Sequence, residues 1–120
     1  MGKPFDIKER TFEFAIAVLD IVERLPQSRI GNCVSNQIVR SGTSVGANIE
    51  EAAAGSSKPD FVNKTLIALR EARETNYWLR IIERKKLLPE GDIRDLILES
   101  EEIKKILGAI VSSSRNTRKK

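Results

Sequence analysis

Apolar residues recur along this chain every three to four positions, the spacing at which side chains share one face of an α-helix. Short stretches rich in Gly, Pro and Ser separate four such amphipathic segments. Capping and helix-breaking residues place their ends near residues 6–25, 32–54, 57–86 and 92–113. Because short loops between long amphipathic helices imply antiparallel neighbours, the sequence predicts an all-α, up-down four-helix bundle.

The first segment carries two apolar stripes instead of one. One stripe consists of Phe12, Ala15, Ile16, Leu19 and Val22. The other consists of Ile7, Phe14, Val18, Ile21 and Leu25. Together they cover about half of the helix circumference, which is more than a single core face requires. We therefore expect one stripe to face the bundle interior and the other to face a second subunit.

The other three segments each have one predicted inward face. In the second it comprises Val34, Ile38, Ser41, Val45, Ile49 and Ala52. In the third it comprises Phe61, Thr65, Ala68, Ala72, Thr75, Leu79 and Ile82. In the fourth it comprises Ile93, Leu96, Ile97, Ile103, Leu107, Ile110 and Val111. The 4-3 spacing in the third segment is typical of a bundle seam.

Small residues dominate the middle of the second segment, between Ser41 and Asn48. Gly42 and Gly46 lie four positions apart, hence on one face, where a neighbouring backbone can approach closely. The low helix propensity of this stretch also allows a break into two shorter helices. A phosphate-binding loop is a weaker alternative, because no Gly-Lys-Ser/Thr follows the glycines.

The charge is concentrated at one end of the chain. The whole sequence has 21 Lys and Arg against 17 Asp and Glu, a formal net charge of +4. The last six residues contain Arg115, Arg118, Lys119 and Lys120 and no acid, so residues 1–114 are neutral overall. We interpret residues 1–114 as the bundle and 115–120 as a basic tail. Such a tail either contacts nucleic acid or an acidic partner, or simply remains solvated.

Catalytic chemistry finds little support in the composition. There is no His, which excludes His-based catalysis and His metal sites. The lone Cys33 suits a reducing cytoplasm, and no apolar run is long enough to span a membrane. Carboxylates at helical spacing, such as Glu71 with Glu74, alternate with Lys and Arg as on solvated faces. We predict no catalytic residue, no metal site, no cofactor and no enzymatic activity.

One helix face is rich in arginine. Five residues of the third segment fall within about 80° of one another at 100° per residue. They are Arg70, Arg73, Tyr77, Arg80 and Arg84, called here the arginine ridge. Arginine suits phosphate recognition, and Tyr77 can stack on a base. The alternative is interhelical or intersubunit pairing with Glu71, Glu74, Glu83 or acids of the first and second segments. The neutral bundle argues against a broad nucleic-acid surface.

Residues 37–51, QIVRSGTSVGANIEE, and residues 68–79, ALREARETNYWL, together resemble a bacterial family called four-helix bundle protein, or 23S rRNA intervening-sequence protein. The resemblance extends from Phe5 to about Ser113. The family's signature positions correspond here to Arg40, Ser41, Ser44, Ala47, Asn48, Ile49 and Glu51. Many members have Gly where this chain has Ala52, which leaves the end of the second helix uncertain.

This resemblance implies antiparallel four-helix bundles that assemble into rings, commonly homopentamers. Some members are encoded within intervening sequences of large-subunit rRNA genes. A related, strongly basic branch assists a reverse transcriptase of diversity-generating retroelements and binds RNA. Two functions follow as expectations: a cytoplasmic, oligomeric scaffold that binds protein, or an accessory protein that binds RNA or a nucleic-acid-handling protein. We expect Arg40, Asn48 and Glu51 to be structural, linking helices by charge-assisted hydrogen bonds.

Overall fold

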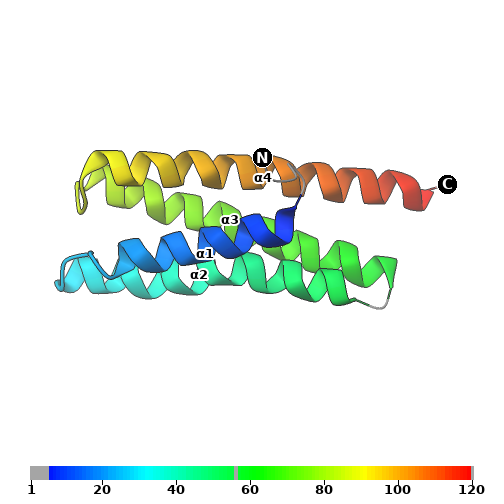
Figure 1. The fold of residues 1–120 in the computed structure, drawn as a ribbon, viewed down its shortest axis with the longest axis horizontal. Coiled ribbons are helices and arrows are strands. Elements are labelled where there is room, and N and C mark those ends of the chain that lie inside the picture. Colours follow the sequence, from blue (N-terminus) through cyan, green and yellow to red (C-terminus); the bar gives the residue numbers. More distant parts are fainter. Residues whose placement is uncertain (1–5, 56, 120) are drawn as a thin grey trace.

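The computed structural model describes residues 6–55 and 57–119, with side chains described through residue 115. Within these residues the chain forms four α-helices and no strand (Figure 1). The helices are α1 (Ile7–Val22), α2 (Arg29–Ala54), α3 (Lys58–Arg84) and α4 (Glu90–Lys119). The predicted all-α class is therefore confirmed, and the arrangement is that of an elongated helical bundle.

Helices that follow one another in sequence lie side by side, and α1 also packs against α4. The backbones of α1 and α3 do not approach each other, so these two helices lie on one diagonal of the bundle. Helix α1 has 16 residues, whereas the other three have 26 to 30. As a result, the C-terminal part of α4 continues past the start of α1 (Figure 1). The outward faces of α1 and α3 thus lie on opposite sides of the molecule.

Side-chain caps begin three of the helices. Asp6 accepts a hydrogen bond from the backbone N–H of Glu9, and Ser57 accepts one from Asp60, as the sequence predicts. Ser28 accepts from Gly31 and starts α2 at Arg29, three residues before the predicted start.

Four other ends differ from the sequence-based expectation, among them that of α3, which ends at Arg84 instead of near residue 86. Helix α1 ends at Val22. The backbone N–H groups of Arg24 and Leu25 donate to carbonyl oxygens three residues earlier, not four, so the chain leaves the α-helical geometry before it reaches Pro26. Helix α4 begins at Glu90, directly after Pro89, two residues earlier than expected. Its helical backbone continues to Lys119, six residues beyond the expected end.

The inward faces form one continuous apolar core. All predicted inward residues of α2 are buried, and in α3 and α4 only Phe61 and Ile110 are half-buried. On α1 the stripe containing Phe14, Val18 and Ile21 faces this core. The pattern of apolar residues therefore identified most of the interior, and Val62 and Leu69 of α3 are buried in addition to the predicted face.

The small residues of α2 lie against α1. A Cβ atom placed on Gly42 would be 2.8 Å from Val18 Cγ1, and one on Gly46 would be 3.1 Å from the Thr11 carbonyl oxygen. The predicted close approach is confirmed, and the approaching element is α1. Helix α2 is unbroken through this stretch, which excludes the alternative of two shorter helices.

Candidate functional site

An apolar stripe faces outward on α1. Phe12 is 54% exposed, Ile16 40% and Leu19 38%, and they follow one another at helical spacing. These three residues, called here the outer stripe, are the exposed members of one predicted apolar stripe, whereas Val22 of the same stripe packs against the core. Large side chains in an uninterrupted row on a surface indicate a contact site more strongly than scattered ones do.

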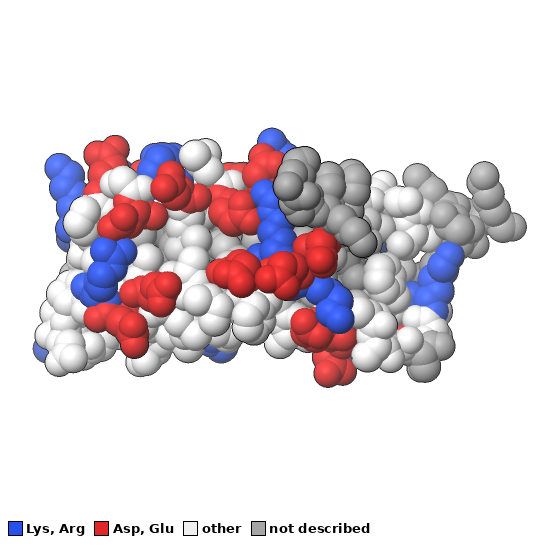
Figure 2. Space-filling model, viewed as in Figure 1, with Lys and Arg blue, Asp and Glu red and all other residues white. Residues whose placement is uncertain are grey.

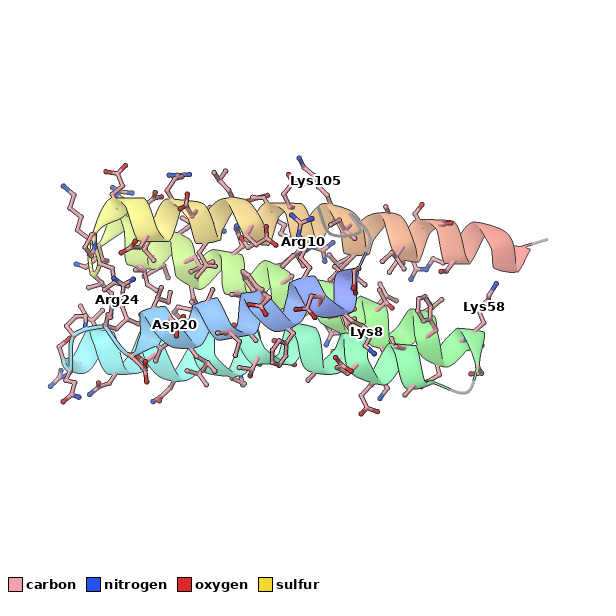
Figure 3. All side chains as sticks on the ribbon, in the orientation of Figure 1. Lys8, Arg10, Asp20, Arg24, Lys58 and Lys105 are labelled. Carbon is pink, nitrogen blue, oxygen red and sulfur yellow. The ribbon has the colours of Figure 1, made fainter. Side chains whose placement is uncertain are left out.

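The basic side chains near the outer stripe are directed to neighbouring helices. Lys8 pairs with Glu50 of α2 at 3.7 Å, Arg10 with Glu99 of α4 at 2.7 Å, and Arg24 with Asp92 of α4 at 2.8 Å (Figure 3). The acids beside the outer stripe are exposed and form no ion pair with any described residue. They are Glu9, Glu13, Asp20 and Glu23, called here the acidic flank. Figure 2 shows acidic side chains on the face that carries α1, with Lys and Arg side chains and uncharged surface between them.

The arginine ridge lies along the outward face of α3. All five of its residues are exposed, with Tyr77 at 49%. The guanidinium carbon of Arg80 lies 5.9 Å from the centre of the Tyr77 ring, within the range of a cation–π contact. Arg70, Arg73 and Arg84 form no ion pair with any residue in the described part of the chain. The ridge is therefore a row of cations with one exposed aromatic ring.

The acids that could neutralise the ridge pair instead with arginines of other helices. Arg40 of α2 donates to Glu71 at 3.1 Å and also to Glu74, while Arg94 of α4 donates to Glu83. The hydrogen bond from Arg40 lowers the pKa of the Glu74 carboxyl and raises the pKa of the Arg40 guanidinium. The acids on both sides of the ridge thus join α3 to its neighbours and leave the ridge arginines unneutralised.

A buried polar cluster, which sequence reasoning missed, lies between α3 and α4 and contacts one arginine of the ridge. Asn76 is only 3% exposed and donates to Ser100 Oγ at 2.8 Å and to a Glu101 carboxylate oxygen at 2.9 Å. Its own side-chain oxygen accepts a hydrogen bond from Arg80 Nε at 2.9 Å. The one sequence signal for this cluster is a polar residue at the border between the seam and the ridge of α3. Asn76 therefore orients Arg80 and joins α3 to α4.

Arg40, Asn48 and Glu51, which we expect to link helices, differ in what they contact. Arg40 links α2 to α3, as described above. The amide of Asn48 donates to the Ser44 carbonyl oxygen at 2.9 Å and to Ser44 Oγ at 3.1 Å, one turn back in the same helix. Glu51 is exposed and pairs with no described residue. Asn48 and Glu51 therefore do not link helices within the described residues, because one binds its own helix and the other faces solvent.

Trp78 lies beside the ridge, half-buried against the core. Its indole N–H donates to Glu74 at 3.2 Å, and its ring meets that of Tyr77 edge to face with centroids 5.2 Å apart. These contacts give Trp78 a role in packing α3 against the core.

The basic tail begins on α4. Arg115 is exposed on this helix. The side chains of Arg118 and Lys119, and the whole of Lys120, lie outside the described residues. The helical backbone through Lys119 directs the start of the tail along the bundle axis.

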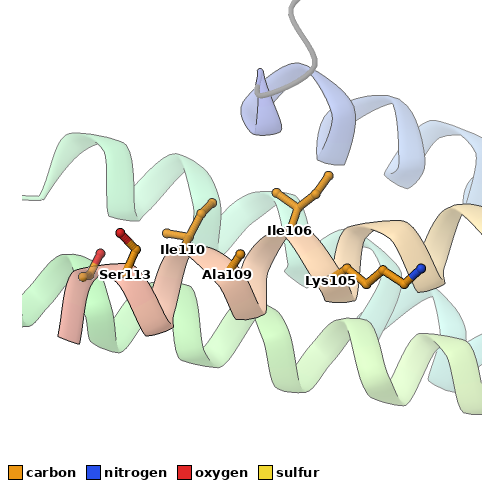
Figure 4. Close-up of a pocket in the computed structure, with 6 residues that line it drawn as sticks. Lys105, Ile106, Ala109, Ile110 and Ser113 are labelled. Atoms are coloured by element: carbon orange, nitrogen blue, oxygen red, sulfur yellow. The ribbon is translucent and has the colours of Figure 1, made fainter. Parts of the chain in front are cut away.

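Two apolar hollows lie near the free end of α4. One, of about 440 Å³, is lined by α4 alone, with Ile106 and Ile110 pointing to the same side of the helix (Figure 4). The other, of about 250 Å³, lies between the start of α1 and residues of the other three helices, including Ile49 and Phe61. Among the described residues there is no group of three or more Cys, Asp and Glu side chains that could hold a metal. Of the described helices, none combines the length and the apolar character needed to cross a membrane.

The fold defines an all-α helical bundle with an exposed apolar stripe on α1 and an exposed arginine-rich face on α3. The sequence matches the 23S rRNA-intervening sequence protein family over residues 3–109, and the chain belongs to this family. A similar crystal structure is that of a protein of unknown function from the S23 ribosomal protein family of Bacteroides thetaiotaomicron VPI-5482. The two share 39% sequence identity with a TM-score of 0.82, over 88% of this chain and 97% of the other. No curated protein matches the sequence.

Proposed function

We propose that this protein is a non-enzymatic scaffold of the cytoplasm that assembles with copies of itself into a ring, with five subunits as the expected number. The observation that carries the proposal is the outer stripe of α1. Its three large apolar side chains gain stability when they leave water, at roughly 25 cal/mol for each Å² that is covered. A surface of this kind on a short helix is suited to binding a further protein subunit.

Several polar groups of the kinds that serve in catalysis form structural hydrogen bonds and ion pairs, which supports the non-enzymatic part of the proposal. Thr75 donates to Ser41 Oγ at 2.9 Å in the core, and Thr43 donates to the Val39 carbonyl oxygen at 2.7 Å. Glu71 and Glu74 pair with Arg40. With no His in the sequence, the hydroxyl groups of Ser41, Thr43 and Thr75 lack the imidazole base that commonly activates such a nucleophile.

Native mass spectrometry at low salt tests the assembly directly. We expect a ring of about five subunits for the wild type and smaller species for the double variant Phe12→Ser/Ile16→Ser. The matched control is Ile30→Ser/Leu98→Ser, which removes two side chains that are 47% and 54% exposed away from the outer stripe. A monomeric wild type, or a stripe variant that assembles like the control, would contradict the proposal.

A second candidate function is that of an RNA-binding accessory protein. The unpaired arginines of the ridge favour it, since their neighbouring acids are occupied by Arg40 and Arg94. Phosphate contacts lose affinity steeply as salt rises, because each contact releases condensed counterions.

RNA binding can be measured as a function of salt for the wild type, for Arg70→Gln/Arg84→Gln and for a chain lacking residues 115–120. If this second candidate is right, each change weakens binding and makes its salt dependence shallower. The control Arg29→Gln/Lys58→Gln removes two exposed charges that belong to neither the ridge nor the tail. Binding that is equally weak for all four proteins would exclude the RNA function.

A further inference from the structure

The two outward faces of this chain carry opposite unpaired charge. On α1 the acidic flank has no ion-pairing partner among the described residues, because the nearby cations Lys8, Arg10 and Arg24 are committed to Glu50, Glu99 and Asp92. On α3 the ridge has no acidic partner within the described part of the chain, because Glu71, Glu74 and Glu83 pair with Arg40 and Arg94. The charges of a nearly neutral body are thus separated onto two surfaces.

The two faces also match in length and character. The acidic flank runs from Glu9 to Glu23 and the ridge from Arg70 to Arg84, each spanning about 21 Å at 1.5 Å per residue. Apolar side chains accompany the acids, and the flat ring of Tyr77 accompanies the arginines. Arginine and tyrosine are enriched in protein interfaces because they combine apolar surface with hydrogen-bonding groups.

We propose that the outward face of α1 in one copy of this chain docks on the arginine ridge of α3 in the next copy. The inference rests on the proposed self-assembly and names the surfaces that form it. The stems of the ridge arginines and the Tyr77 ring cover Phe12, Ile16 and Leu19. The guanidinium groups then form charge-assisted hydrogen bonds with the carboxylates of the acidic flank.

The position of these faces explains how the contact propagates. Because α1 and α3 lie on one diagonal of the bundle, a copy that uses its α1 face still presents its ridge on the opposite side. Contacts between two different surfaces are heterologous, and they close into a ring when the rotation between copies allows it. In such an assembly α1 of a neighbouring copy covers the ridge, so only the basic tail remains available for contacts with RNA.

Charge reversal tests this pairing. The ridge variant is Arg73→Glu/Arg84→Glu, the flank variant is Glu13→Lys/Asp20→Lys, and the combined variant carries all four changes. None of these four side chains forms a hydrogen bond or ion pair with a described residue. The charge-matched control is Arg29→Glu/Lys58→Glu, at exposed positions that begin α2 and α3.

We expect each single reversal to lower the mass seen by native mass spectrometry from that of the assembly to that of a monomer. The combined variant should assemble more fully than either reversal alone, since the reversed positions again offer opposite charges to one another. The control should assemble like the wild type. Circular dichroism of every variant checks that the helices are retained.

The possible failures are distinguishable. A monomeric wild type contradicts the proposed self-assembly and this inference together. A wild type that assembles, with single reversals that leave its mass unchanged, overturns only the pairing of α1 with α3. A combined variant that is folded and monomeric also overturns the pairing, as does a ridge variant that loses bound RNA and keeps its subunit number.

Discussion

At the scale of single residues, two glycines determine how closely α1 approaches α2. The space above Gly42 is filled by Val18, which is completely buried, and the space above Gly46 is filled by the backbone of Thr11. The absence of a side chain therefore matters more here than the loss of helix propensity that glycine brings. The opposite situation holds at Gly108 of α4, where a Cβ would meet nothing within 4 Å.

We predict that Gly42→Ala and Gly108→Ala change stability in opposite directions. Alanine is favoured over glycine in a helix by about 1 kcal/mol, so Gly108→Ala should stabilise the protein by up to that amount. At Gly42 the added methyl overpacks the contact with Val18, at a cost of about 1–3 kcal/mol that outweighs this gain. Urea unfolding of both variants measures the difference. If Gly42→Ala is stabilised as much as Gly108→Ala, the close packing is not present in solution.

At the scale of helices, arginines from α2 and α4 hold α3 in place. Arg40 bridges to Glu71 and Glu74, and Arg94 bridges to Glu83. These pairs are partly exposed, so each contributes modestly to stability. Their larger consequence is that Glu71, Glu74 and Glu83 pair with arginines of other helices and do not neutralise the ridge arginines on their own helix.

The pairing of Glu74 with Arg40 predicts a pH dependence of stability. Hydrogen bonding to Arg40 lowers the pKa of Glu74 below its ordinary value of 4.5, which we take for the unfolded chain. The unfolded state therefore takes up a proton more readily than the folded state as the pH falls. The stabilisation is complete above pH 4.5 and is lost as the pH drops through the lowered pKa.

Unfolding by urea at pH 7 and at pH 3 checks this expectation. The decrease in the free energy of unfolding between the two values should be smaller for Glu74→Gln than for the wild type. Glu51→Gln, at an exposed carboxylate without an ion pair, should keep the full decrease. Equal decreases in the wild type and in Glu74→Gln would show that the Arg40 pair does not persist in solution.

At the scale of the whole molecule, the net charge of residues 1–114 is zero, but several positive and negative charges that form no ion pair within the described residues lie on different faces. The structure places unpaired acids on α1 and unpaired arginines on the diagonal helix α3. Apolar side chains accompany the acids, so neither face resembles an ordinary solvated surface. The chain therefore presents two complementary surfaces in opposite directions.

An assembly formed through these surfaces makes thermal stability depend on concentration. Because association stabilises the folded state by mass action, the Tm of the wild type should rise by several degrees over a hundredfold increase in protein concentration. Differential scanning calorimetry measures this shift. Phe12→Ser/Ile16→Ser should melt at one temperature throughout, whereas Ile30→Ser/Leu98→Ser should follow the wild type. A wild-type Tm that does not change with concentration would contradict the assembly.

The sequence by itself determined the helical fold, the core and two of the helix caps. Burial of apolar side chains depends on their spacing along one helix, and capping depends on residues within one turn, so both are local properties. Phe14 and Ile38 could be assigned to the core for this reason, and Asp6 and Ser57 to helix starts. The outer stripe and the ridge were also visible as faces of single helices.

Only the tertiary structure decided which charges remain unpaired. Glu71, Glu74 and Glu83 are neighbours of the ridge along α3, so sequence distance alone suggested that they pair with it. Arg40 and Arg94 approach them from other helices once the bundle forms. The burial of Asn76 against Ser100 likewise joins two helices. Such pairings depend on rotation and register between helices, which no periodicity within one helix encodes.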